Sequence, residues 1–431
     1  MEDRDYYART KKIIPDCVQT LSKRNSVHTD NYPRFIEFGK GCKVESVKKM
    51  HDSGSATLQT HIDYPCGLGA ILLGYSDLDV NEAVIKRIKY GTLFSLPNRL
   101  ETELAEEIKK LVPSMEMMRF VKTGSEACSA AVKLGRAYTK KNGVAIFGYG
   151  GWHDWFTINT PKKKGIPREY QNYIASFEYN NLESLREIFS LSKSCLTEVG
   201  VVIMEPYVYD APDAGFLQAV IDLAHSNGAV VIFDETVTGM RTKNYTAQGY
   251  YGVTPDLTVL GKALGNGFPI AVVGGKEEIM KELEGDCFVS STFGGDLVGI
   301  SAALAVLKKL QKEPVLDHIW DMGTKLRDGF NELARKNNLF DVNAIGHPCR
   351  LFFNFPSNRH KGLFWQECIK RGVLFGYATF INYAHQLEDI EKTLDAIDES
   401  LAIVKENYDF PENVLVGEPP IETQRMLAAK R

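Results

Sequence analysis

A strand that ends on a lysine constrains this chain more than any other feature. The apolar run Leu257–Leu260 is followed by Gly261 and Lys262. A second apolar run, Ala229–Phe233, ends on Asp234, 28 positions before the lysine. A strand–helix–strand unit takes about thirty residues, so we expect both side chains at one edge of a parallel sheet, where open α/β folds bind ligands. The alternative is a surface lysine beside a helix-capping aspartate. It becomes less favoured only if other site residues lie at the same edge.

The alternation of strands and helices along the chain predicts the fold class and the domains. Residues 71–314 alternate between the two, which is typical of a mostly parallel sheet covered by helices on both faces. Residues 1–70 predict an N-terminal arm and a small β-meander, with a turn at His51–Ser55, that packs with the C-terminal domain. Residues 315–431 predict a smaller α+β domain and a tail, in which Ile421–Arg431 is a candidate short helix. We therefore expect an α/β protein.

Composition excludes several classes of function. The chain has 44% hydrophobic and 25% charged residues, as in ordinary globular proteins. Its net charge of −4 argues against a nucleic-acid partner. The eight cysteines are scattered without a Cys-x-x-Cys pair, a pattern that suits reduced thiols better than disulfides or a metal site. Neither a signal peptide nor a membrane-spanning apolar run is evident, so we expect a cytoplasmic protein with no membrane partner.

Two further strand ends carry residues that suit a phosphorylated aromatic cofactor. The first opens a helix with Gly124 and Ser125, whose backbone N–H groups and hydroxyl can hold a phosphate. An ordinary capping box has the same appearance. The second leads into a glycine-rich segment with Trp152 and His153, where a flat ring could stack on an aromatic side chain. A tryptophan of the core is the alternative interpretation.

One more strand end, together with the two described first, completes a constellation of five. This strand ends on Glu205, which can order a neighbouring loop or contact a ligand. Asp234 can keep a pyridine nitrogen protonated, and Lys262 can form an imine (a Schiff base) with an aldehyde. A phosphate seat, a stacking plane, a ring-nitrogen anchor and an imine-forming amine together indicate pyridoxal 5′-phosphate as the cofactor.

These residues also carry a family resemblance over roughly residues 33–405. The segments resemble those of class III (subgroup II) pyridoxal-phosphate-dependent aminotransferases, above all the glutamate-1-semialdehyde aminomutase-like branch. The matching segments are Thr123–Ala127, Trp152–Asp154, Phe233–Arg241 and Lys262–Pro269. The resemblance implies the type I aminotransferase fold and a homodimer.

The resemblance also implies a role for each residue of the site. Lys262 is the implied catalytic residue, which forms the internal aldimine, and Asp234 holds the ring nitrogen. Trp152 stacks on one ring face, and Thr236 or Val237 packs against the other. The partner subunit's phosphate is contacted by Thr292. The implied cofactor-binding set is Gly124, Ser125, Trp152, His153, Glu205, Asp234, Thr236, Val237, Lys262 and Thr292.

The expected reaction moves an amino group from an amino-acid donor to a carbonyl acceptor, with a sugar or small metabolite of surface-glycan biosynthesis as one acceptor class. The first alternative is an intramolecular glutamate-1-semialdehyde-type 2,1-aminomutase, and the second is a catalytically silent binding protein. The segment Gly376–Phe380 holds no arginine that could bind a substrate carboxylate. The lysine-rich segment Thr157–Arg168 is a candidate entrance loop or a solvated basic loop.

Overall fold

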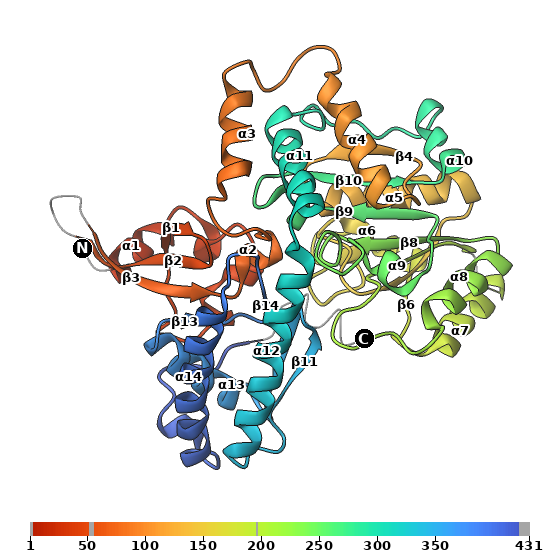
Figure 1. Cartoon of the computed structure of the whole chain (residues 1–431). Helices are drawn as coiled ribbons and strands as arrows, with labels where there is room; N and C mark the ends of the chain where they lie inside the picture. The colour runs from red at the N-terminus through yellow and green to blue at the C-terminus, as the bar shows by residue number, and fades with distance from the viewer. Residues whose placement is uncertain (1–2, 51–55, 195–196, 422–431) are drawn as a thin grey trace. The chain divides into compact units, whose positions relative to one another are not determined.

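The computed structural model describes residues 3–50, 56–194 and 197–421 (Figure 1). The described chain forms two compact units. One runs from Leu78 to Leu316, and the other combines the residues up to Asp77 with those from Asp317 onward. The boundaries expected from the sequence fall after residues 70 and 314. The turn expected at His51–Ser55 and, except for Ile421, the terminal helix expected at Ile421–Arg431 lie outside the described residues.

A seven-stranded sheet forms the centre of the Leu78–Leu316 unit, in the order β4-β10-β9-β8-β7-β5-β6. Only β10 runs antiparallel to its neighbours, so the sheet is mostly parallel, as expected. The two central strands are buried along their whole length, as parallel strands covered on both faces must be, and they are apolar except for Asp234 and Glu235 at the end of one of them. The strands are β4 (Met117–Val121), β5 (Gly143–Phe147), β6 (Ile174–Ser176), β7 (Val199–Met204), β8 (Val230–Glu235), β9 (Leu257–Leu260) and β10 (Ala271–Gly275).

Helix α5 (Gly124–Thr139) lies across this sheet and contacts β4, β7, β8, β9 and β10. A capping box fixes its start, because the Thr123 hydroxyl accepts the Glu126 N–H and the Glu126 carboxylate accepts the Thr123 N–H. The other helices of the unit are α3 (Leu78–Ile88), α4 (Arg99–Leu111), α6 (Asp154–Thr157), α7 (Leu182–Ser194), α8 (Phe216–Ser226), α9 (Ala247–Tyr251), α10 (Glu277–Met280) and α11 (Leu297–Lys312), with 3-10 turns at Arg168–Tyr173, Lys262–Gly265 and Lys281–Glu284.

The second unit contains two small sheets. Strands β1 (Ile36–Lys40), β2 (Lys43–Met50) and β3 (Ala56–Asp63) form the expected meander, and β13 (Val373–Leu374) adds to β3 in parallel. The other sheet is antiparallel and consists of β11 (Asn343–His347), β12 (Arg350–Asn354) and β14 (Thr379–Phe380). The helices are α1 (Asp3–Thr10), α2 (Cys66–Gly69), α12 (Val315–Lys336), which begins at the unit boundary, α13 (Asn358–Lys370) and α14 (Leu387–Glu406), with 3-10 turns at Pro15–Cys17, Leu21–Lys23, Asn25–Val27 and Pro411–Asn413.

Aromatic side chains fill the interior of this second unit. Phe330 of α12 stacks on Phe353 of β12 with ring centroids 4.4 Å apart, and Phe364 of α13 stacks on Phe375 at 5.7 Å. Such pairs join the helices to the sheet through large buried surfaces. Among the described helices of the whole chain, none is long and apolar enough to span a bilayer.

Candidate active site

The register of the parallel strands brings four chemically active positions to one edge of the large sheet. Phe147 of β5 pairs with Met204 of β7, and Met204 pairs with Phe233 of β8. The next residues along these strands, Gly148, Glu205 and Asp234, therefore stand side by side, because neighbouring strands lie about 4.8 Å apart. On β9, Leu260 pairs with Glu235, which places Lys262 just beyond the same edge. The expected neighbourhood of Asp234 and Lys262 follows from this pairing.

Asp234 is a carboxylate removed from water. The residue is only 6% exposed. One carboxylate oxygen accepts the Thr236 backbone N–H at 3.0 Å, and the other accepts the thiol of Cys128 on α5 at 3.3 Å. Burial, followed by the negative charge of Glu205, raises the pKa of Asp234, while hydrogen bonding from Thr236 and the charge of Lys262 act in the opposite direction. The site thus contains a destabilised negative charge that a cationic partner would neutralise.

Glu235, the next residue on β8, has a different environment. Its carboxylate accepts four hydrogen bonds, from the Thr238 hydroxyl at 2.9 Å, from the backbone N–H groups of Ala247 and Gln248 at 2.6 and 3.1 Å, and from the Gln248 side chain at 3.2 Å. All of these donors are buried with it. Glu235 therefore holds α9 against the sheet, and no coordination remains for a ligand.

Lys262 has a backbone conformation that residues other than glycine rarely adopt. Its φ angle is +43°, in the left-handed region, which costs about 1–3 kcal/mol and occurs preferentially at functional sites. The side chain is half-buried. Its charge acts on both Asp234 and Cys128 and partly opposes the rise in pKa that burial causes in each. The end of β9 therefore directs an amine toward the buried carboxylate.

The first turn of α5 forms a narrow cradle with the loop that follows β5. The Trp152 backbone N–H donates to the Ser125 hydroxyl at 3.3 Å. A Cβ atom added at Gly151 would lie 2.5 Å from that hydroxyl, and one added at Gly124 would lie 2.8 Å from the Thr236 side chain. Glycine is thus required at both positions for this close approach. The N–H groups of the first helical turn have no intrahelical acceptor and suit an anion.

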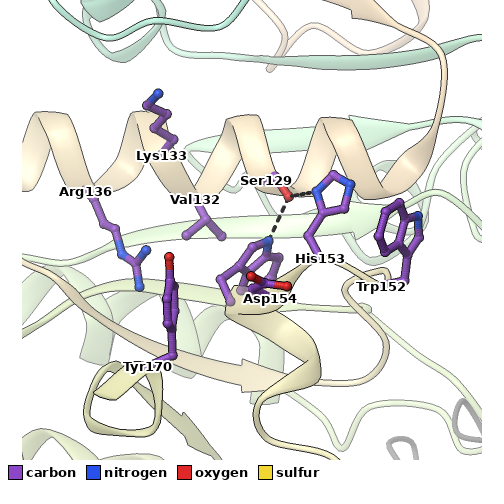
Figure 2. Close-up of a pocket in the computed structure, with 9 residues that line it drawn as sticks. Ser129, Val132, Lys133, Arg136, Trp152, His153, Asp154 and Tyr170 are labelled. Atoms are coloured by element: carbon purple, nitrogen blue, oxygen red, sulfur yellow. Dashed lines mark hydrogen bonds between the residues drawn. The ribbon is translucent and has the colours of Figure 1, made fainter. Parts of the chain in front are cut away.

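The neighbouring residues Trp152 and His153 differ in their surroundings: Trp152 is exposed, and His153 contacts α5. Trp152 is 69% exposed, so its stacking on a ring stays a prediction. The His153 ring turns to α5, where its Nδ1 lies 2.6 Å from the Ser129 hydroxyl (Figure 2). That hydroxyl also accepts the indole N–H of Trp155 at 2.8 Å. Because an indole can only donate, the Ser129 proton is available for His153 Nδ1, which favours the tautomer with the proton on Nε2.

A cavity of about 500 Å³ lies beside this trio. It is lined by Ser129, Val132, Lys133, Arg136, Trp152, His153, Asp154, Trp155 and Tyr170. Two cations at its margin are already engaged by backbone oxygens, Lys133 with Phe288 at 2.7 Å and Arg136 with Asn142 at 2.8 Å. Residues 161–165 of the expected entrance loop, including its three lysines, are exposed.

The remaining predicted positions fall into two groups. Glu205, Thr236 and Val237 are buried around the same sheet edge, and Glu205 accepts the Tyr149 backbone N–H at 3.1 Å, which orders the loop after β5. Thr292 lies on an exposed loop, and its action on a partner subunit stays a prediction. Sequence reasoning missed Cys128 and Tyr149. The signal for Cys128 was its position one helical turn after Gly124, which puts both on one face of α5.

We predict that the two adjacent carboxylates affect stability with opposite sign. In cofactor-free protein, Asp234→Asn removes a desolvated charge and raises the melting temperature, by about 1 °C for each kcal/mol recovered. Glu235→Gln places an amide donor against buried donors and lowers the melting temperature. The loss of folding free energy is about 1–3 kcal/mol for each acceptor contact that is lost. Thermal unfolding of both variants and of the unsubstituted protein tests the contrast.

The gain from Asp234→Asn depends on pH. The pKa of Asp234 is higher in the folded than in the unfolded protein. The carboxylate therefore costs no folding stability at a pH low enough to protonate it in both states. The full cost is reached once the pH exceeds the folded-state pKa. The gain should therefore be larger near pH 7.5 than near pH 4. A variant that is destabilised at neutral pH would contradict the assignment of Asp234 as an uncompensated charge.

Comparison with known proteins agrees with this geometry. The family model described as aminotransferase class-III matches residues 26–401. A 3-aminobutyryl-CoA aminotransferase of Cloacimonas acidaminovorans is 33% identical, over 93% of this chain and 96% of its own. A glutamate-1-semialdehyde 2,1-aminomutase of Alkaliphilus oremlandii is 32% identical, over 93% and 98%.

Solved structures show the same fold. The FumI protein of Sphingopyxis sp. MTA144, described in its pyridoxal-phosphate internal aldimine form, superposes with a TM-score of 0.86 at 24% identity, over 96% of this chain and 100% of its own. An omega-transaminase of Sphaerobacter thermophilus gives 0.82 at 24% identity, over 93% and 97%. The expected aminotransferase fold is confirmed, and the chain belongs to the class-III aminotransferases.

Proposed function

We propose that this protein is a pyridoxal-phosphate-dependent aminotransferase that moves an amino group from an amino-acid donor to a carbonyl acceptor. The observation that carries the proposal is the buried, incompletely compensated carboxylate of Asp234 beside Lys262 at the edge of the sheet. A buried charge of this kind is costly and is retained where a ligand cation completes it. Membership of the class-III family supports the same reading.

The residues present fit the cofactor. The α5 cradle offers unpaired N–H groups and the Ser125 hydroxyl at a place where glycines permit close approach, which suits a phosphate. Asp234 suits a protonated ring nitrogen, and Lys262 suits an aldehyde. When bound, pyridoxal phosphate supplies an aldehyde that takes up the amino group and a ring that accepts the electrons of the broken Cα–H bond.

The side chains of this chain then have separate tasks. Asp234 keeps a proton on the ring nitrogen and so maintains the ring's capacity to withdraw electrons. Lys262 would take the proton from Cα of the donor and return it to the cofactor carbon that carried the aldehyde, as a general base and then a general acid. Glu205 orders the Gly148–Tyr149 turn beside the ring position. Thr236 and Val237, both buried after β8, limit the other face.

An intramolecular 2,1-aminomutase is the second candidate, and relatives of both kinds are about equally similar to this chain. Both reactions need Asp234, Lys262 and the phosphate seat, so these residues do not separate them. An aminomutase must retain its intermediate by holding both ends of a short substrate. We favour the transaminase, because the segment Gly376–Phe380 holds no arginine for a substrate carboxylate.

We also propose that the active form is a homodimer. The segment 78–96 exposes seven large apolar side chains, which we call the 78–96 apolar surface: Leu78, Ile85, Ile88, Tyr90, Leu93, Phe94 and Leu96, between 38% and 79% exposed. Large apolar side chains that are exposed together are typical of a subunit interface. Phe288 and Phe293 are also exposed, at 75% and 60%, on the loop that carries Thr292. A second copy that covers these residues would bring Thr292 to a phosphate seat.

The first prediction concerns Lys262. Borohydride reduction of the holoprotein should remove its visible colour and fix the cofactor mass to Lys262, and Lys262→Ala should reduce turnover by about 10²–10⁴-fold or more. Two matched lysines also follow strands of the sheet but are ion-paired, Lys122 with Asp296 at 2.8 Å and Lys276 with Asp256 at 2.7 Å. Label on either of these instead would contradict the assignment.

The second prediction separates the two reactions. A single amino donor without acceptor should convert the bound cofactor stoichiometrically to its amine form, seen as loss of the visible band. Addition of an oxo acid, an aldehyde or a keto sugar should restore the band and yield an aminated product. Conversion of glutamate 1-semialdehyde to 5-aminolevulinate without any external donor would instead establish the aminomutase.

The third prediction tests the dimer. Ile88→Glu combined with Leu96→Glu should convert the sedimenting dimer to a monomer. The double variant should also release the cofactor about tenfold faster, which corresponds to loss of one charge-assisted hydrogen bond from Thr292. Phe340→Glu is the matched control, since Phe340 is 78% exposed, against 79% for Leu96, but lies in the other unit. A monomer that keeps full cofactor affinity would refute the shared site.

A further inference from the structure

The helix that forms the phosphate cradle also touches the ring-nitrogen anchor. Gly124 and Cys128 are four residues apart and lie on the same face of α5. Gly124 packs against Thr236, and the Cys128 thiol contacts Asp234 Oδ2 at 3.3 Å. One turn of α5 thus meets the end of β8 at two points.

We propose that Cys128 is a positioning residue, whose thiol donates a hydrogen bond to Oδ2 of Asp234. This bond orients the carboxylate toward the ring nitrogen of the cofactor. It also keeps the proton between the two groups on the nitrogen. The proposal rests on the proposed function for its cofactor. It assigns Cys128 no covalent chemistry. The residue acts through Asp234 and not through a contact with the ring.

The environment keeps Cys128 in the form that can donate. The residue is 1% exposed, and burial, followed by the negative charges of Asp234 and Glu205, raises the pKa of its thiol well above the ordinary value despite the nearby charge of Lys262. Cys128 therefore stays a neutral S–H group. Asp234 has no proton to give at neutral pH once a cationic ring faces it, so the thiol donates and the carboxylate accepts.

The direction of the effect follows from acid–base chemistry. A carboxylate and a pyridine nitrogen share one proton, which resides on the stronger base of the two. Each donor to the carboxylate stabilises the charged form and weakens it as a base. The Thr236 N–H and the Cys128 S–H therefore keep the proton on the ring. Removal of the thiol should move the proton toward Asp234 and reduce the ring's electron withdrawal.

The thiol contact can be tested first without cofactor, by a double-mutant cycle of Cys128→Ala and Asp234→Asn in thermal unfolding. Cys128→Ala should destabilise the protein more near pH 7.5 than near pH 4, because a larger fraction of the carboxylate is charged at the higher pH. Asp234→Asn should abolish that pH dependence. Cys368→Ala is the control, because Cys368 is buried and donates at 3.4 Å to the neutral Ser400 hydroxyl. Its cost should not vary with pH.

The holoprotein test uses cofactor labelled with ¹⁵N in the ring. In unsubstituted protein and in Cys128→Ser, which keeps a donor, the ¹⁵N shift should report a protonated ring nitrogen. In Cys128→Ala the shift should move toward the unprotonated value, and conversion by an amino donor should slow by about tenfold, the lower end for a hydrogen bond to a charged group. Cofactor retention should change much less, because the phosphate cradle is intact.

Three outcomes would overturn the inference. A Cys128→Ala protein with the ¹⁵N shift of the unsubstituted one would show that the thiol does not place the proton. A Cys128→Ser protein as impaired as Cys128→Ala would show that packing, and not donation, is what matters. Failure of the unsubstituted protein to bind pyridoxal phosphate at all would overturn the proposed function together with the inference.

Discussion

The site depends on a carboxylate that folding removes from water without neutralising it. Asp234 receives two hydrogen bonds, from Thr236 and Cys128, yet burial and Glu205 keep its charge unfavourable. Burial of an incompletely paired charge costs several kcal/mol. Burial raises the pKa of the adjacent Glu235 as well, but four donors satisfy its carboxylate, whereas Asp234 has two. Of the two neighbouring acids, Asp234 is therefore the one with acceptor capacity left for a ligand.

Parallel strand pairing turns this local charge into a site. The register of β5, β7, β8 and β9 brings Gly148, Glu205, Asp234 and Lys262 to one edge, while α5 crosses the same edge with its N-terminal turn. Each of these strands is buried on both faces, so the polar side chains at or just beyond the strand ends are the first that can meet a ligand. The proposed phosphate seat, the carboxylate and the amine meet there, although Ser125 of the seat lies more than a hundred residues before Asp234 in the chain.

The small residues at this edge are as important as the charged ones. Gly124 and Gly151 let the first turn of α5, the end of β8 and the loop after β5 approach closely. A methyl group at either position would force Thr236 or Ser125 to move. The positive φ angle of Lys262 is a comparable constraint on the backbone. Such strain persists because the surrounding sheet holds it in place.

The sequence by itself determined the fold class and the pair at its centre. Apolar runs that end on Asp234 and Lys262, one strand–helix–strand unit apart, predict their meeting because strand ends and crossover lengths are local properties. Only the tertiary structure decided the partners across the sheet: the thiol of Cys128 on Asp234, Glu205 beside it, Ser129 on His153, and the outward position of Trp152. Those contacts join residues distant in the chain, and their side-chain directions follow from packing, which no local pattern encodes.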